Sequence, residues 1–223
     1  MNILAVDTSG SFCSVALSVA GRVFSLSSAG TGDHFEQLPR MVQELCESSG
    51  VQPGSIQEVR IGLGPGSFTG LRIGMSFVKG LSWSLRVPLT GYSSFAAVAA
   101  AAFVHEETPE RVVVVADARR DEGFVAQFSR GNGVDVAPCI IPIAELRMAP
   151  WSIAEDGVAV VSPQRDFSIE GVSIRSEGEA ARGILLLPAD AQSGFSIQEI
   201  SVMEPTYLRA VAAKTIEERK IGA

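Results

Sequence analysis

The fold is decided by the stretch Ile3–Gly21, which reads ILAVDTSGSFCSVALSVAG. Its first part, Ile3–Val6, is a short apolar run that ends at an aspartate, and such a run predicts a buried strand. In the part from Cys13 to Val19 every second side chain is apolar, which predicts a second strand. The turn at Gly21 then allows Val23–Leu26 to return as a third strand. The opening of the chain is therefore predicted to be a three-stranded meander.

The second half of the chain opens in a similar way. Val112–Ala116 is an apolar run that again ends at an aspartate, and Gly123–Phe128 follows as a second predicted strand. The two openings match without a gap at one constant spacing, which pairs Asp7 with Asp117, Val15-Ala16 with Val125-Ala126 and Gly21 with Gly131. We interpret this match as a duplicated unit. The alternative is that two hairpins are alike by chance.

Helices and further strands follow each opening. Apolar spacing predicts helices over Phe35–Ser48, Leu71–Leu85 and Ser94–His105 and a strand over Val59–Leu63. The second half has a predicted strand over Val158–Val161 and predicted helices over Glu179–Leu186 and Ala210–Lys220, while Pro163–Ser176 receives no assignment. Two such units predict an α/β fold with two ribonuclease-H-like lobes, as in actin, hexokinase and Hsp70. The predicted lobes are residues 1–106 and 107–223, and the last helix is free to return to the first lobe.

Composition limits the functions open to this chain. Its 223 residues are 46% hydrophobic, so it can bury a substantial core, and 25 acidic against 18 basic side chains give a net charge of −7. A protein that binds nucleic acid by itself needs clustered Lys and Arg, so we expect any RNA to be contacted mainly through partners. The longest apolar run, Phe95–Val104, is shorter than the roughly 20 residues of a membrane span. The start, MNILAVD, lacks the basic residues of a signal peptide, and we expect a cytoplasmic protein with no membrane partner.

A phosphate site is one hypothesis for the turns after the strands. In paired-lobe proteins of this kind the first hairpin of each lobe can bind nucleotide phosphates, with Asp7 and Asp117 near a phosphate-bound metal. The segment Gly62–Gly74 (GLGPGSFTGLRIG) opens a predicted helix, where backbone N–H groups favour an anion. The alternative is structural, with both aspartates capping turns and the segment forming a tight turn capped by Ser67 or Thr69. The candidate nucleotide- or anion-binding residues are Asp7, Thr8, Ser9, Gly64, Gly66, Ser67 and Asp117.

The helix predicted over Leu71–Leu85 contains two glycines, Gly74 and Gly80, and each costs about 1 kcal/mol relative to alanine. The close approach of another backbone would offset that cost. Ser76, Gly80 and Ser84 form a stripe of small residues beside a stripe of large apolar ones. The approaching element is either the sheet of the same lobe or a helix of a second protein. The candidate partner-interface residues, on this helix and on Phe35–Ser48, are Leu38, Met41, Val42, Leu45, Gly74, Ser76, Phe77, Gly80, Leu81 and Ser84.

No catalytic constellation is predicted. The two histidines, His34 and His105, lie far apart in the sequence and in no metal-binding spacing. The three cysteines are dispersed and form no CxxC pair, which argues against a zinc site or a disulfide framework. No metal ligand and no catalytic residue is therefore assigned, and the chain is not expected to be a self-sufficient enzyme.

Four segments occur in one order along nearly the whole chain: ILAVDTS from Ile3, GLGPGSFTGLRIG from Gly62, DARRDEGF from Asp117 and EPTYLR from Glu204. Together they resemble the TsaB family, also called YeaZ. The resemblance implies a non-catalytic subunit for the synthesis of N6-threonylcarbamoyladenosine at position 37 of tRNA. It implies that the paralogue TsaD transfers the threonylcarbamoyl group and binds this subunit through helices of the first lobe. It further implies that the ATPase TsaE joins the complex and that the subunit forms a homodimer when alone.

One departure from TsaD bears on catalysis. TsaD carries an HxxxH metal motif soon after a Val-Pro segment, and here Ser94 and Val98 occupy those two positions. Neither side chain replaces an imidazole ligand, so the resemblance implies no cofactor of the chain's own, with ATP or ADP only within the complex. Two hypotheses follow. The first is a scaffold that binds and supports TsaD, and the second is an independent nucleotide hydrolase or phosphotransferase that uses Asp7, Asp117 and the glycine-rich segment.

Overall fold

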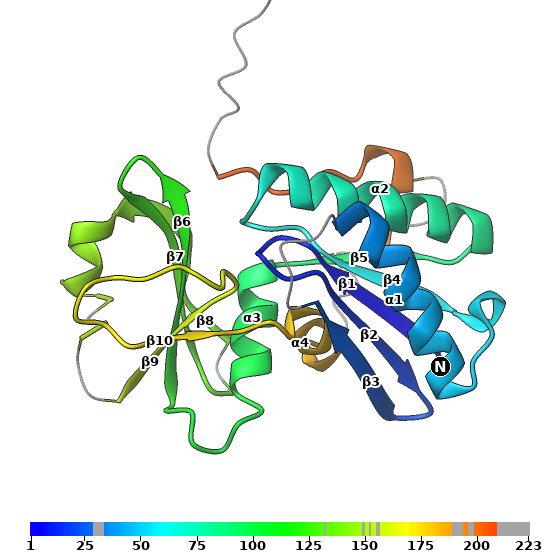
Figure 1. Cartoon of the computed structure of the whole chain (residues 1–223), viewed down its shortest axis with the longest axis horizontal. Helices are drawn as coiled ribbons and strands as arrows, with labels where there is room; N and C mark the ends of the chain where they lie inside the picture. The colour runs from blue at the N-terminus through cyan, green and yellow to red at the C-terminus, as the bar shows by residue number, and fades with distance from the viewer. Residues whose placement is uncertain are drawn as a thin grey trace, which may run out of the picture.

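The structure is a computed structural model that describes residues 1–28, 34–131, 133–148, 150–151, 153–154, 157–188, 194–195 and 199–208. These residues form two lobes, each built on one β-sheet, with two helices between the sheets (Figure 1). The predicted α/β fold with two lobes is confirmed.

The first lobe is a six-stranded sheet in the order β11-β5-β4-β1-β2-β3. Its strands are β1 (Ile3–Asp7), β2 (Ser14–Val19), β3 (Arg22–Ser27), β4 (Glu58–Gly62), β5 (Leu89–Tyr92) and β11 (Gly194–Phe195). The first three strands are antiparallel neighbours, while β4 is parallel to β1 and β5 is parallel to β4. The predicted meander is therefore confirmed.

The second lobe repeats this topology in a five-stranded sheet with the order β10-β9-β6-β7-β8. Its strands are β6 (Arg111–Arg119), β7 (Glu122–Ser129), β8 (Gly133–Pro142), β9 (Val158–Ser162) and β10 (Ile174–Ser176). An antiparallel meander is again followed by two parallel strands, so the duplication is confirmed at the level of topology. The gap-free register is off by one residue, because Val15 pairs with Val6 but Val125 pairs with Val115 instead of Ala116.

Four α-helices accompany the two sheets in the described part of the chain. They are α1 (His34–Ser49), α2 (Phe68–Leu85), α3 (Ser94–Ala102) and α4 (Ala180–Leu186). Three short 3-10 turns are η1 (Pro53–Ser55), η2 (Ile143–Arg147) and η3 (Ile200–Val202). Helix α2 begins three residues before its predicted start at Leu71, because the Ser67 hydroxyl caps it by accepting a 3.2 Å hydrogen bond from the N–H of Gly70.

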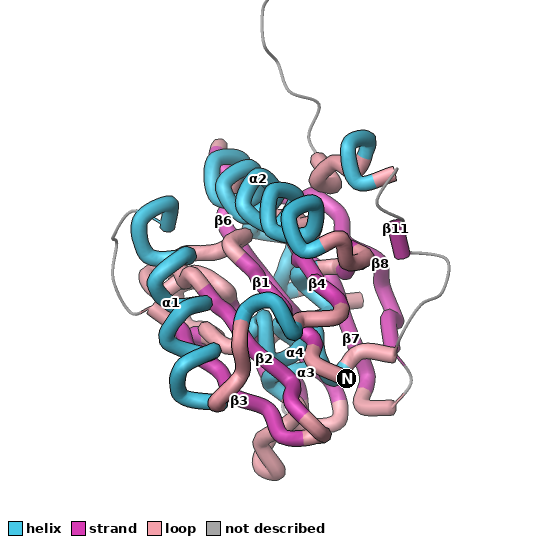
Figure 2. Tube along the Cα trace, turned by 90° about the vertical axis from the view of Figure 1, so that its right-hand side faces the viewer, coloured by secondary structure: helices cyan, strands magenta, loops and turns pink. Residues whose placement is uncertain are grey.

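Successive side chains of β1 point to opposite faces of the sheet, and each face is covered by its own layer of the first lobe. Leu4 and Val6 point to one face and pack with α1 and α2, whereas Ala5 points to the other face and packs in the core between the lobes. Figure 2 shows α1 and α2 lying side by side over the sheet. The sheet therefore carries this helix pair as an outer layer.

The two lobes meet through α3 and α4, which contact each other between the sheets (Figure 1). The interface is made of small residues, and a Cβ at Gly183 would collide with the carbonyl of Ala97. The apolar run Phe95–Val104 owes its many alanines to this close packing. No helix in the described ranges combines the length and apolarity that crossing a bilayer requires.

The last described segment returns to the first lobe. Strand β11 pairs with β5, and the ammonium of Lys79 on α2 donates to the carbonyl of Ser201 at 3.1 Å. The N–H of Thr206 donates to the carbonyl of Leu63 at 2.8 Å. The range 107–223 thus contributes to both lobes. The helix predicted over Ala210–Lys220 lies outside the described residues.

Candidate functional site

The structure brings most of the predicted phosphate-site residues together, around the turn that follows β1. The Thr8 hydroxyl donates to the carbonyl of Gly70 at 2.8 Å. The N–H of Ser9 and its hydroxyl donate to the same oxygen of Asp7 at 2.9 and 2.7 Å. The N–H of Ser67 donates to the carbonyl of Ser9 at 2.7 Å. These four donors of the turn are therefore bonded within the chain.

The glycine-rich segment packs directly on this turn. The N–H of Gly64 donates to the Ser94 hydroxyl at 2.9 Å. A Cβ at Gly66 would collide with the backbone of Ser9, and a Cβ at Gly70 would collide with the carbonyl of Thr8. These glycines are required for close approach. The Thr8 hydroxyl and the N–H groups of Ser9, Gly64 and Ser67 already have partners within the chain, which favours the structural alternative, and an anion site at this turn stays a prediction.

The two strand-end aspartates play the same local role in both lobes. One oxygen of Asp7 accepts from the N–H two residues later, and one oxygen of Asp117 accepts from the N–H of Arg119 at 2.6 Å. Both are turn caps, as in the structural alternative. Asp117 also pairs with the Arg119 guanidinium at 3.2 Å and is partly exposed. Asp7 is buried, and that burial raises the pKa of its carboxyl, while hydrogen bonds from Ser9 and Ser94 and the charge of His34 oppose the shift.

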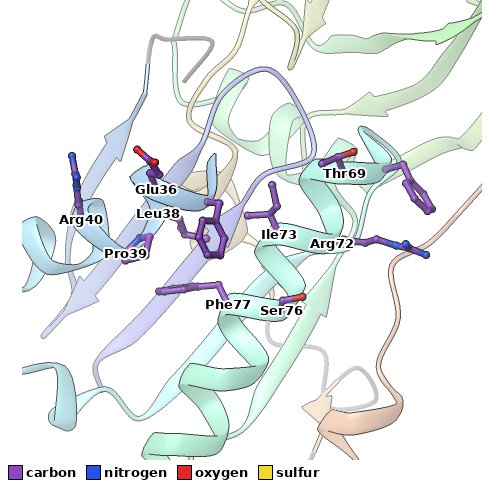
Figure 3. Close-up of a pocket in the computed structure, with 11 residues that line it drawn as sticks. Glu36, Leu38, Pro39, Arg40, Thr69, Arg72, Ile73, Ser76 and Phe77 are labelled. Atoms are coloured by element: carbon purple, nitrogen blue, oxygen red, sulfur yellow. The ribbon is translucent and has the colours of Figure 1, made fainter. Parts of the chain in front are cut away.

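The outer face of the first lobe carries a groove of about 890 Å³ between α1 and α2. It is lined by Phe35, Glu36, Leu38, Pro39, Arg40, Phe68, Thr69, Arg72, Ile73, Ser76 and Phe77. In Figure 3, Ile73 and Phe77 project from α2 toward α1. We call the exposed surface of these two helices, with this groove between them, the α1–α2 face. A second hollow of about 620 Å³ continues it past Pro39 and Phe77 to the end of α1.

The small-residue stripe of α2 lies on the open part of this face. Ser76, Gly80 and Ser84 are all exposed, and a Cβ at Gly80 would meet nothing within 4 Å. Gly74 differs, because it is buried and a Cβ there would collide with the hydroxyl of Thr8. Of the two alternatives for the approaching element, the sheet side of this chain explains Gly74 but not Gly80. Nothing in the described residues explains Gly80.

Several predicted interface residues lie below this face instead of on it. Leu38, Val42 and Leu45 are buried in the core between α1, α2 and the sheet, and Gly74 is buried as described above. Their side chains are covered mainly by their own lobe, although Leu38 lines the groove and Val42 lines the second hollow, and their contact with a partner stays a prediction. The half-buried members of the predicted set, Met41, Phe77 and Leu81, pack against the same core from its outer edge.

Sequence reasoning missed the aromatic side chains of this face. Phe35, Phe68 and Trp83 are exposed by 71%, 39% and 63%, and they are the exposed aromatics of the described residues. All three belong to α1 or α2. Trp83 lies three residues after Gly80 and thus on the same side of the helix, a signal that the sequence contained. Phe68 was missed because the predicted helix began too late.

The positions of Ser94 and Val98 fit structural roles. Ser94 begins α3 and its hydroxyl accepts from Gly64, while Val98 is fully buried in the core between the lobes. Across the ranges that the structure describes, no three His, Cys, Asp or Glu side chains converge in the manner of a metal site.

Comparison with known proteins gives a consistent family signal. The family model described as TsaD, tRNA N6-adenosine threonylcarbamoyltransferase, matches residues 29–216. The tRNA threonylcarbamoyladenosine biosynthesis protein TsaB of Escherichia coli is 36% identical over 135 residues, and its counterpart from Haemophilus influenzae is 34% identical over 130 residues. These matches cover 60% and 58% of this chain and only 58% and 55% of the two relatives.

Solved structures extend the similarity over most of the chain. A Pseudomonas aeruginosa protein, described as uncharacterized with similarity to peptidase YeaZ, superposes with a TM-score of 0.74 and 28% identity. That match covers 93% of this chain and 99% of the other. A second structure, YeaZ from the same organism, gives a TM-score of 0.73 and 27% identity.

Proposed function

The chain belongs to the TsaB (YeaZ) family, and on that premise we propose that it is a non-catalytic subunit of a complex that makes N6-threonylcarbamoyladenosine in tRNA. In this proposal it binds and supports a TsaD-type threonylcarbamoyltransferase through the α1–α2 face. The transferase carries out the chemistry, and this chain acts as its scaffold.

The observation that carries the proposal is the concentration of exposed aromatic side chains on one helix pair. Phe35 and Phe68 line a groove that Ile73 and Phe77 also line, and Trp83 is exposed near the other end of α2. Soluble monomers rarely leave contiguous apolar surface in water, and such surface marks an interaction site. Gly80 adds to this argument, because a helical glycine with nothing above it costs stability unless a partner backbone approaches.

A non-catalytic role is supported by what the residues at the expected catalytic positions do. Ser94 accepts a backbone hydrogen bond, and Val98 fills the core between the lobes. The competing hypothesis of a nucleotide hydrolase is less favoured, because the Thr8 hydroxyl and the N–H groups of Ser9 and Ser67 are bonded within the chain. We therefore propose that ATP or ADP, and the ATPase TsaE, act only in the assembled complex.

The net charge of −7 supports the proposal that the partners, and not this chain, make most contacts with tRNA. An acidic subunit repels the phosphate backbone on average, so the basic surface for tRNA belongs to the partners in this proposal. In the absence of TsaD, the α1–α2 face is free to pair with a second copy of the chain. We propose a homodimer under those conditions, in competition with the heterodimer.

The test is a pair of charge substitutions on exposed apolar side chains. Trp83→Glu places a carboxylate on the α1–α2 face, and Val134→Glu places one on β8 of the second lobe, where the wild-type side chain is 51% exposed. Co-elution with purified TsaD and reconstitution of tRNA modification with TsaD and TsaE are measured for both. We expect Trp83→Glu to lose co-elution with TsaD and to fail to support tRNA modification. We expect Val134→Glu to behave as wild type in both assays.

Size-exclusion chromatography with and without TsaD gives the oligomeric states. Wild-type protein should run as a dimer alone and as a heterodimer with TsaD. Full binding and modification by Trp83→Glu, in a variant with a wild-type melting temperature, would refute this face as the docking site. Robust ATP turnover by the isolated chain would refute the scaffold role.

A further inference from the structure

Arg72 occupies a junction on the α1–α2 face. Its stem lines the groove of about 890 Å³, and the same residue lines a smaller hollow of about 210 Å³ on the other flank of α2. Figure 3 shows its side chain extending from α2 on the side away from Ile73 and Phe77, toward the last described segment of the chain. Arg72 therefore forms the ridge between two hollows.

The guanidinium of Arg72 is held in place by two aromatic residues. Its central carbon lies 3.9 Å from the ring centroid of Phe68, which is stacking distance. Its Nε lies 3.5 Å from the hydroxyl of Tyr207, and the Tyr207 ring lies 5.4 Å from that of Phe68. The Phe68–Arg72–Tyr207 cluster thus joins the start of α2 to the last described segment.

That segment is itself fixed on the lobe. Met203 is buried in the core under α2, and the N–H of Thr206 donates to the carbonyl of Leu63 at 2.8 Å. Tyr207 follows directly. Because these contacts anchor Tyr207, the cluster restricts Arg72 before any partner arrives, and less side-chain entropy is then lost on binding.

Arg72 has no acidic partner in the described part of the chain. Glu36 lines the groove and Glu204 lines the smaller hollow, but no ion pair among the described residues includes Arg72. Its terminal amino groups make no hydrogen bond to any described residue. In the free protein, water solvates them.

Docking of a partner on this face changes the solvation of the Arg72 guanidinium. A partner that fills the groove removes water from the ridge, and a buried charge without a counter-charge is strongly destabilising. The planar fork of a guanidinium matches a carboxylate with two parallel hydrogen bonds. We propose that Arg72 is a specificity-determining residue that binds a carboxylate side chain of the TsaD-type partner. This inference rests on the proposed function and names the chemistry that the partner must present.

The test compares three substitutions by their dissociation constants for purified TsaD. Arg72→Gln removes the charge and should weaken binding by at least about tenfold. Arg72→Lys keeps the charge but loses the fork, and it should recover only part of that loss. Arg22→Gln is the matched control, because Arg22 also stacks on a phenylalanine, with its guanidinium 5.5 Å from the Phe24 ring, and lines none of these hollows. It should bind as wild type does.

A double-mutant cycle identifies the carboxylate. Each Asp or Glu of TsaD is neutralised to Asn or Gln in turn, and each variant is titrated against wild-type protein and against Arg72→Gln. One TsaD variant should lose affinity for wild type and lose almost nothing further with Arg72→Gln. If every pair of losses multiplies independently, no carboxylate pairs with Arg72 and the proposal is wrong.

The remaining outcomes distinguish a wrong role for Arg72 from a wrong assignment of TsaD binding. Wild-type protein that fails to bind TsaD contradicts the proposed function. Wild-type binding that Arg72→Gln leaves unchanged contradicts this inference alone, as does full recovery by Arg72→Lys. If Arg72→Gln weakens TsaD binding only in buffer with phosphate or ATP, Arg72 binds a small anion instead of a carboxylate side chain, and the proposal is also overturned. Melting temperatures of the variants should match wild type, because the side chain is exposed.

Discussion

The hydroxyl of Thr8 fills the space where a side chain at Gly74 would begin. Thr8 lies in the turn after β1, and its hydroxyl bonds to the carbonyl of Gly70, one helical turn before Gly74. The start of α2 is therefore locked onto the end of β1. This contact explains one glycine of the helix by packing within the lobe and leaves Gly80 to be explained by a partner.

The two glycines of α2 should respond oppositely to alanine. Gly74→Ala forces a methyl group against Thr8 and should lower the free energy of unfolding by about 1–3 kcal/mol. Gly80→Ala has open space and should raise it by roughly 0.5–1 kcal/mol, because alanine is the better helix former. Urea unfolding of both variants checks the pair. Equal effects would mean that the two sites are not packed differently.

Gly80→Leu should separate folding from assembly. The leucine has room on the free helix and favours it, so the melting temperature should not fall. On the α1–α2 face the added side chain blocks the approach of a partner backbone, and binding to TsaD should weaken by about tenfold or more. Calorimetry and co-elution measure the two effects. A stable variant that still binds fully would show that no backbone approaches Gly80.

The contact between the lobes depends on Gly183. A Cβ there collides with the carbonyl of Ala97, and backbone cannot move aside as a flexible side chain does. Gly183→Ala should therefore cost about 1–3 kcal/mol of stability. Gly54→Ala is the matched control, since a Cβ at Gly54 meets nothing within 4 Å, and it should stay within about 0.5 kcal/mol of wild type. A tolerated Gly183→Ala would mean that the lobes adjust their spacing easily.

Asp7 should make stability depend on pH in one direction. Its pKa is raised by burial, so between the ordinary carboxyl pKa and the raised one the folded state holds a proton that the unfolded state has lost. The contribution of this group to stability therefore falls as pH rises through that interval. Asp7→Asn does not ionise and keeps an oxygen to accept from Ser9. It should be more stable than wild type at pH 8, with the difference shrinking toward pH 4.

Urea unfolding of wild type and Asp7→Asn at both pH values measures this difference. If Asp7→Asn were the less stable protein at pH 8, the ionised carboxylate would be favoured in the folded state, contrary to the raised pKa.

The cysteines should differ in reactivity. Cys13 and Cys46 are buried, and burial, with a smaller effect of Asp7, raises the pKa of Cys13 to about 12. Because the thiolate is the reactive form, neither should react with Ellman's reagent at pH 8 in the native protein. Cys139 is half-buried with a pKa that burial also raises, so it should react slowly. All three should react in urea. Fast native labelling of Cys13 would mean that the β1–β2 turn opens readily.

Much of the fold follows from local sequence. The apolar runs Ile3–Val6 and Val112–Ala116 became β1 and β6, and their repeated setting predicted the duplication that the sheet orders confirm. Register was less predictable. Three consecutive residues, Arg119, Arg120 and Asp121, adopt positive φ in the second-lobe turn, and the strand pairing there shifts by one residue. No local sequence pattern predicts three consecutive non-glycine residues with positive φ.

The sequence by itself determined the family, the two-lobed architecture and the helix that carries the small-residue stripe, because apolar periodicity and motif order are local properties of the chain. Only the tertiary structure decided which side of that helix is covered. Gly74 and Gly80 are about one and two thirds turns apart and so lie on different sides of the helix, and their spacing does not say which one faces the sheet. Burial depends on contacts between segments that are distant in the sequence. Here Thr8 packs against Gly74, while no described residue covers Gly80.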